Sequence, residues 1–219
     1  MHGYLSYSLV ALSAIFVVVD PISVVPLFVA MTAGDTSEKR HAMALRACLV
    51  GAGLLIVFAL FGAVIFKFMG VTLGAFKVAG GILLLLTALD MLKAQPSRTR
   101  STQAETDEGA QKADIAIVPL AVPLLAGPGS VATVMVLMSK GPGFWVGIPV
   151  VAAILLTFVA SYFMLRAAGI VDRALGKSGN AILQRIMGLM LAAIAIQFMV
   201  DGLGGLLPEI LHHASGHGA

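Results

Sequence analysis

Long apolar runs, separated by short polar stretches, make up most of the chain. Uncharged segments cover residues 47–66, 115–139 and 141–165. Each segment is long enough to cross a hydrocarbon core of about 30 Å as an α-helix. The pattern therefore predicts three membrane spans without a charged residue.

Three further apolar segments contain charged residues and cover residues 4–33, 68–92 and 181–207. In the first of these segments, Asp20 is the only charged residue. A helical span needs about 20 predominantly apolar residues, and charges inside it are costly and rare. We therefore expect an all-α, polytopic membrane protein with six transmembrane helices.

The composition supports a membrane protein. Hydrophobic residues make up 59% of the chain and charged residues 11%, whereas soluble domains have about 45–50% and about 25%. The mean hydropathy is +0.99. We expect a lipid bilayer around the chain, and the composition gives no support for nucleic-acid binding. Because the first residues, MHGYLSYSLV, lack a basic stretch, we interpret them as the start of the first span and not as a cleaved signal peptide.

Positive charges are distributed unevenly over the connections between the expected spans. Lys67, Lys77 and Lys140 fall on one side of the membrane if the spans alternate in direction. The other Lys and Arg residues fall around the connections between spans one and two, three and four, and five and six. Cytoplasmic loops carry an excess of Lys and Arg. This distribution predicts that both termini lie outside the cytoplasm.

The polar stretch 94–113 divides the chain into two halves of three expected spans each, residues 1–93 and 114–219. We interpret this stretch as a cytoplasmic linker. A shift of 107 positions aligns VDPISVVPLFVAMT with AGPGSVATVMVLMS, and five of the 14 positions are identical. Because each half contains an odd number of spans, the second half enters the membrane from the opposite side. The alignment predicts two inverted three-helix repeats, a common plan of secondary transporters.

The aligned segments carry matching helix breakers, Asp20-Pro21 in the first half and Gly127-Pro128 in the second. Proline disrupts a helix interior but suits the first helical turn, where its missing N–H would have no partner. We expect helices 1 and 4 to be broken at midmembrane, with each second part beginning at the proline. Backbone groups freed there are tolerated only inside protein or beside a water-filled cavity.

Asp20 has two interpretations that the residues leave open. As a cap of the following half-helix it would contribute about 0.5–2 kcal/mol. A carboxylate at a helix centre in the bilayer costs about 2.5–3.5 kcal/mol on insertion scales. Because capping alone does not offset this cost, we favour a carboxylate that is protonated, exposed to water or paired with a cation.

The second breaker has no carboxylate, and its glycines leave the first-turn amides open to a ligand. Such a helix end attracts anions. We expect Asp20 to receive a cation, which is an ammonium group or a coupling proton or sodium ion, and the turn to receive a carboxylate. A small zwitterion would match both ends. The candidate substrate-binding residues are Asp20, Pro21, Ser23, Gly127, Pro128, Gly129 and Ser130.

Other functions find less support in the sequence. An intramembrane aspartyl protease needs two carboxylates in one site, but Gly127 aligns with Asp20. No zinc motif or nucleophile signature is found, so we expect no enzyme activity, no metal and no cofactor. A channel, or a structural or stress-related membrane protein without a substrate, remains an alternative. A homo-oligomer is compatible with the sequence.

Four segments together resemble the MarC family of integral membrane proteins: VVVDPISVVPLF, AFKVAGGILLLLTALDML, PLAVPLLAGPG and RIMGLMLAAIAIQFMVDGL. The resemblance covers nearly the whole chain. It implies a six-span protein of the bacterial or archaeal cytoplasmic membrane, related to transporters of small neutral amino acids such as glycine and alanine. The name, taken from a multiple antibiotic resistance locus, does not imply drug efflux.

The chain departs from the usual family pattern directly after the Asp20-Pro21 pair. Members commonly have glycine and then asparagine where this chain has Ser23 and Val24. A polar contact made by that amide is therefore lost here, and the substrate preference of related transporters does not carry over without a test.

Overall fold

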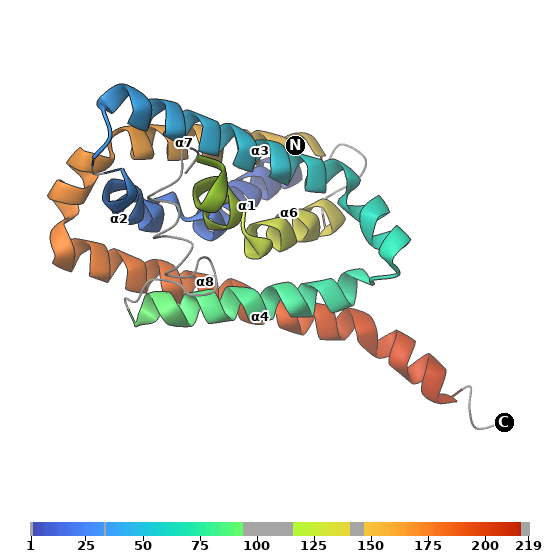
Figure 1. The fold of residues 1–219 in the computed structure, drawn as a ribbon. Helices are drawn as coiled ribbons and strands as arrows, with labels where there is room; N and C mark the ends of the chain where they lie inside the picture. Colours follow the sequence, from blue (N-terminus) through green and yellow to red (C-terminus); the bar gives the residue numbers. More distant parts are fainter. Residues whose placement is uncertain (1, 33, 94–115, 141–146, 216–219) are drawn as a thin grey trace.

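The computed structural model describes residues 2–32, 34–93, 116–140 and 147–215, and these ranges are predominantly helical (Figure 1). The expected linker 94–113 lies outside the described residues, so the proposed division of the chain at this point stays a prediction. The helices are α1 (His2–Val19), α2 (Pro21–Met31), α3 (Ser37–Met69), α4 (Leu73–Leu92), the π-helix η1 (Ala116–Leu125), α6 (Pro128–Lys140), α7 (Gly147–Arg166) and α8 (Ala168–Ser215).

Five helical stretches of the described residues are long and apolar enough to cross a membrane. They are Tyr4–Met31, Ser37–Met69, Leu73–Leu92, Gly147–Arg166 and Ser178–Leu206. The chain is thus an all-helical, polytopic membrane protein, as the hydrophobic pattern predicts.

The expected fourth span, residues 115–139, contains two short helices. η1 has 10 residues and α6 has 13, whereas a helix needs about 20 to cross the hydrocarbon core alone. Neither helix therefore qualifies as a span by itself, and the number of six spans stays a prediction.

Local signals explain where several helices begin and end. Thr36 caps α3 and Thr72 caps α4, because their side chains accept hydrogen bonds from the amides of Lys39 and Ala75. Gly70 ends α3 in the left-handed conformation, with φ 68°, which glycine adopts without a steric penalty. α3 and α4 are therefore joined by a tight turn.

The long helix α8 changes direction at Gly176, which has φ 59° and ψ −177° inside the helical stretch. Only glycine adopts this backbone conformation readily. The part of α8 that is apolar enough to span a membrane begins two residues later, at Ser178.

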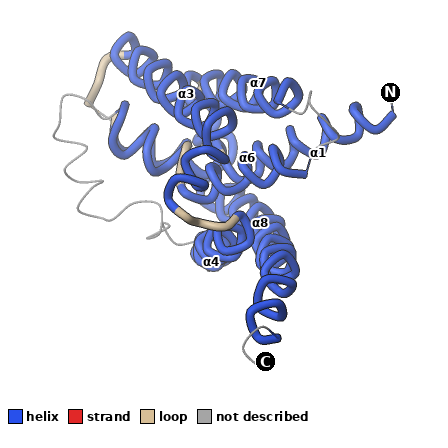
Figure 2. Tube along the Cα trace, turned by 90° about the vertical axis from the view of Figure 1, so that its right-hand side faces the viewer, coloured by secondary structure: helices blue, strands red, loops and turns tan. Residues whose placement is uncertain are grey.

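Helices that lie far apart in the sequence pack against each other. α4 packs along α8 and α3 along α7, as Figures 1 and 2 both show, and α1 packs against α6. One buried cluster joins α1, α2, α3, η1, α6 and α7. A second cluster joins the α4·α8 pair to α1 and α6 through Val17, Val18, Ala132 and Val136. The α4·α8 pair therefore forms one side of the molecule and the other helices form the rest.

Small residues allow α4 and α8 to approach closely along an antiparallel seam. Three small-residue pairs recur at intervals of seven along both helices: Gly74 with Gly202, Gly81 with Ala195, and Ala88 with Gly188. A Cβ atom added at Gly81 would lie 2.8 Å from the carbonyl oxygen of Ala195, and one added at Gly202 would lie 2.7 Å from that of Gly74. Close backbone approach of this kind stabilises helix pairs in membranes, where lipid removes the hydrophobic driving force.

We predict that Gly81→Ala destabilises the protein. The added methyl group meets the Ala195 backbone, which cannot rotate away, so the free energy of unfolding should fall by about 1–3 kcal/mol. The midpoint of thermal unfolding in detergent measures this loss. Gly53→Ala is the matched control, because nothing lies within 4 Å of its added Cβ. Equal unfolding midpoints for the two variants would contradict the close packing of α4 and α8 at Gly81.

Candidate functional site

The first helix interruption is centred on Asp20. α1 ends at Val19 and α2 begins at Pro21, while Asp20 has the left-handed values φ 49° and ψ 60°. Among the described residues, Asp20 is the one non-glycine residue with positive φ. Its amide donates to the carbonyl of Phe16 at 2.9 Å and so completes α1. Pro21 disfavours a helical conformation of the residue before it, which accounts for the interruption at this point.

The Asp20 carboxylate is buried. Asp20 has an exposed fraction of 0%, and the neighbouring residues Val18, Val19, Val24 and Val25 are also buried. One carboxylate oxygen, Oδ1, accepts from the Ser23 amide at 3.4 Å. Asp20 therefore caps α2, but over a distance longer than the usual 2.7–3.2 Å of an N–H···O bond.

The second helix interruption lies between the π-helix η1 and α6. The Ala126 amide donates to Ala121 at 2.9 Å, which continues the π-helical pattern by one residue, and α6 begins at Pro128. The first regular hydrogen bond of α6 runs from Val131 to Gly127, at 3.1 Å. The amides of Gly127 and Gly129, and that of Ser130, thus have no partner within α6. They form the N-terminus of α6, and no carboxylate is seen to cap it among the described residues.

Ser23 and Ser130 occupy equivalent positions in the first turns of α2 and α6 but are used differently. The hydroxyl of Ser130 donates to the carbonyl of Leu125 at 3.2 Å, across the second interruption. The hydroxyl oxygen of Ser23 is buried and makes no hydrogen bond among the described residues. The second interruption is therefore stabilised by its own serine, whereas the first retains a buried polar atom with unused bonding capacity.

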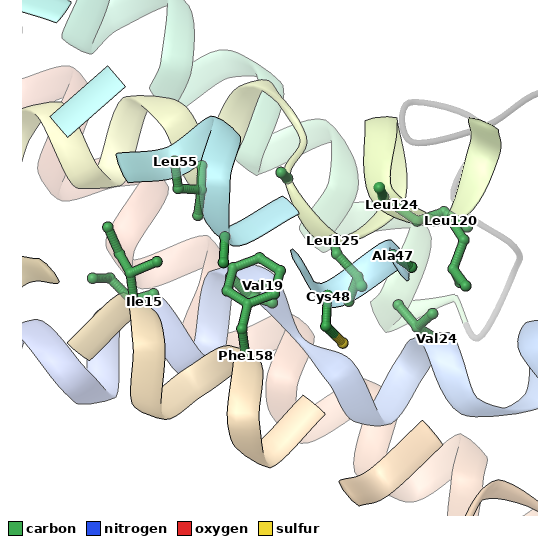
Figure 3. Close-up of a cluster of buried hydrophobic side chains, with 14 of the residues drawn as sticks. Ile15, Val19, Val24, Ala47, Cys48, Leu55, Leu120, Leu124, Leu125 and Phe158 are labelled. Atoms are coloured by element: carbon green, nitrogen blue, oxygen red, sulfur yellow. The ribbon is translucent and has the colours of Figure 1, made fainter. Parts of the chain in front are cut away.

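The two interruptions are held near each other by α3 and α7. Phe158 of α7 and Val19, the last residue of α1, belong to the same buried cluster (Figure 3). A Cβ atom added at Gly51 of α3 would lie 2.6 Å from the Phe158 ring and 3.7 Å from Cβ of Ala126. Gly51 therefore lets α3, α7 and the second interruption meet at one point.

A small pocket lies where α1, α4 and the start of α6 meet. Its lining residues are Val18, Leu83, Leu84, Thr87, Gly127, Pro128, Gly129 and Ser130. The space that the centre of a water molecule can reach is about 20 Å³. A single water needs about 10–15 Å³ by this measure. The pocket thus admits water but not an amino acid without an outward movement of its walls.

The structure places the predicted site residues in two neighbouring groups. Gly127, Pro128, Gly129 and Ser130 all line the pocket. Asp20, Pro21 and Ser23 do not line it, but Val18, two residues before Asp20, does. Whether these residues bind a ligand stays a prediction.

Sequence reasoning missed the residues of the pocket that α4 contributes, Leu83, Leu84 and Thr87. A signal was present for one of them, because Thr87 is the only polar residue of the run from Ile82 to Leu89. Its side chain is 5% exposed and donates to the carbonyl of Leu83 at 3.0 Å. The two leucines give no comparable signal within a run of four.

Charged residues meet at one end of the molecule, where α6 reaches α8. The Asp201 carboxylate accepts from the Lys140 ammonium group and, at 2.8 Å, from the Gln197 amide. This ion pair joins the C-terminal end of α6 to α8. The part of the chain that the structure describes contains no group of three or more His, Cys, Asp or Glu residues arranged to hold a metal.

Comparisons with known proteins identify the family of this chain. The sequence model described as MarC family integral membrane protein matches residues 5–207. A UPF0056 membrane protein of Methanocaldococcus jannaschii is 41% identical over 204 residues, which cover 93% of this chain and 98% of that protein. The UPF0056 membrane protein YvbG of Bacillus subtilis is 36% identical over 202 residues, covering 90% of this chain and 94% of the relative.

The similarity also extends to the UPF0056 membrane protein YhcE of Escherichia coli, which is 31% identical over 198 residues. Those residues cover 90% of this chain and 92% of the relative. No solved structure matches the chain. The family model covers nearly the whole sequence, including both helix interruptions and the pocket. The chain therefore belongs to the MarC family of integral membrane proteins.

Proposed function

We propose that this protein is a secondary transporter of small neutral amino acids, of the glycine and alanine type, in the cytoplasmic membrane. The observation that carries the proposal is the pocket at the open N-terminus of α6, next to an interruption that contains a fully buried aspartate. The start of α6 favours an anion, whereas the interruption at Asp20 favours a cation. The two interruptions therefore suit the two ends of a zwitterion.

The start of α6 is the proposed site of the substrate carboxylate. The amides of Gly129 and Ser130 have no partner within the helix, and the positive end of the helix dipole points at the same place. Gly127 and Ser130 are buried, which strengthens hydrogen bonds to a charged ligand. An anion is favoured here without a basic side chain.

Asp20 is the proposed acceptor of positive charge. A fully buried carboxylate is costly unless it is neutralised or paired with a cation. The ammonium group of the substrate, a proton and a sodium ion are the candidate cations. Ser23, with its buried hydroxyl oxygen, would supply a second oxygen ligand on the same turn.

The pairing of helices supports two inverted repeats. Under the alignment of the two halves, α3 corresponds to α7 and α4 to α8, and both pairs pack side by side. α1 and α2 correspond to η1 and α6, so the two interruptions occupy equivalent positions. Secondary transporters with inverted repeats bind their substrates at such paired interruptions. We propose six spans on this plan, with both termini outside the cytoplasm.

Uptake by the purified protein tests the proposed function. Labelled glycine and alanine are offered to proteoliposomes while a proton gradient and a sodium gradient are imposed separately. We expect accumulation under one of the two gradients. Equilibration without accumulation would indicate a channel, and no flux under either gradient would overturn transport of these amino acids.

We predict that Asp20→Asn weakens glycine binding to the purified protein. Loss of a hydrogen bond to a charged group costs about 1.5–3 kcal/mol, so the affinity should fall by about 10- to 150-fold. Isothermal titration calorimetry measures this change. Asp35→Asn is the control, because Asp35 lies in the connection between α2 and α3 and pairs with Lys39 in the first turn of α3. Unchanged glycine affinity would show that Asp20 does not hold the substrate ammonium group. If proton- and sodium-driven accumulation also stayed at the wild-type level while the unfolding midpoint fell, Asp20 would be only a helix cap.

We predict opposite effects for the two equivalent serines. Ser130→Ala removes the hydrogen bond to the buried Leu125 carbonyl and should lower the free energy of unfolding by about 1–3 kcal/mol. Ser23→Ala removes a hydroxyl without a hydrogen bond among the described residues. It should leave stability unchanged or raise it, while lowering glycine affinity. Thermal unfolding and calorimetry separate the two effects, and equal destabilisation by both substitutions would contradict this assignment.

A further inference from the structure

We propose that α4 supplies a third wall of the binding site and that Leu84 on this wall limits the size of the substrate side chain. The inference rests on the proposed function and adds a specificity-determining residue to it. Neither helix interruption contains this residue, since Leu84 lies in the middle of α4 (Leu73–Leu92).

Leu84 covers the backbone at the start of α6. Its side chain is 2% exposed and lines the pocket together with Gly129. A Cβ atom added at Gly129 would lie 2.3 Å from Leu84 Cδ2 and 3.7 Å from Val18 Cγ1. The leucine methyl group therefore lies directly against the turn whose amides would bind the carboxylate.

This position determines where the substrate side chain must go. In an α-amino acid the side chain starts one bond from the carbon that carries the carboxylate. A substrate held by the amides of Gly129 and Ser130 thus places its side chain within a few bond lengths of the wall that Leu84 forms. The space open to the centre of a water molecule is about 20 Å³, room for about one water, so a branched side chain fits only if the wall moves. Glycine requires the least displacement of Leu84, and each added methylene requires more.

The position of Leu84 is set by helix packing. Gly80, one turn earlier on α4, lies so close to α6 that an added Cβ would be 2.5 Å from Cβ of Ala132. The seam with α8 holds a second face of α4 at Gly81, about 100° around the helix from Gly80. Because α4 is held on two faces, rotation of the Leu84 side chain is the smallest movement that makes room for a substrate.

Thr87 adds a hydrogen-bond acceptor to the same wall. It lies one turn after Leu84, lines the pocket and is 5% exposed. Its hydroxyl donates to the Leu83 carbonyl at 3.0 Å, which leaves the lone pairs of the oxygen available as acceptors. The open end of α6 offers donors, so Thr87 supplies the complementary contact for the substrate ammonium group.

Uptake measurements with a series of side-chain sizes test the role of Leu84. Glycine, alanine, valine and leucine are compared in proteoliposomes containing the wild-type protein or Leu84→Ala, and kcat/KM is measured for each. One methylene in a hydrophobic pocket changes kcat/KM by about 10- to 200-fold. We expect the valine-to-glycine ratio to rise by at least about tenfold in Leu84→Ala.

Leu86→Ala is the matched control, because it makes the same change on the same helix at a side chain that is 46% exposed. Its valine-to-glycine ratio should equal that of the wild-type protein. Leu84→Val provides a smaller change for the case in which Leu84→Ala does not fold, and it should shift the ratio in the same direction. An unchanged ratio in every folded Leu84 variant would overturn the inference.

The outcomes also distinguish this inference from the proposed function. Wild-type uptake with unaltered size selectivity in the Leu84 variants would overturn only the role of Leu84. No wild-type uptake of any of the four amino acids would overturn both.

The role of Thr87 has its own test. Thr87→Val should weaken glycine binding by about tenfold, because one hydrogen bond is lost, and Thr87→Ser should restore it. Equal binding by Thr87→Val would remove Thr87 from the site.

Discussion

The structure depends on one constraint, which is that backbone groups freed at two helix interruptions must find partners inside the protein. Lipid offers no hydrogen bonds, so an exposed interruption would be costly. The Asp20 carboxylate accepts from the Ser23 amide at one interruption, and the Ser130 hydroxyl donates to Leu125 at the other. α3 and α7 cover both places with apolar side chains such as Phe158. The same arrangement that protects the backbone also places two polar side chains, Asp20 and Ser130, in the protein interior.

Small residues determine how closely the other helices surround these two side chains. Three glycines let α4 and α8 form a close pair: Gly74, Gly81 and Gly202. Gly80 then brings this pair against α6, and Leu84 reaches the first turn of α6 as a result. The packing seam and the pocket are thus parts of one arrangement. A change in the contact between the α4·α8 pair and the other helices would widen the pocket, which in the present conformation admits only water.

The site was partly predictable, and the reason differs from residue to residue. Pro21 and Pro128 predict the starts of α2 and α6, because the effect of proline on the backbone is local. The differing roles of Ser23 and Ser130 could not be predicted, since they depend on which atoms lie opposite each hydroxyl. The π-helix η1 has no recognised sequence signal. Leu84 and Leu86 look alike in a run of four leucines, yet one lines the pocket and the other is largely exposed.

By itself, the sequence determined that the protein is helical and membrane-embedded, where most of its spans lie, and where two of its helices restart. These properties follow from hydrophobic patterns and from proline, which act over a few residues or over one helix. Only the tertiary structure decided that α4 completes the pocket, that Asp20 is fully buried, and that Gly81 and Gly202 belong to one seam. Such facts depend on contacts between segments far apart in the chain, and no local pattern of residues specifies those contacts.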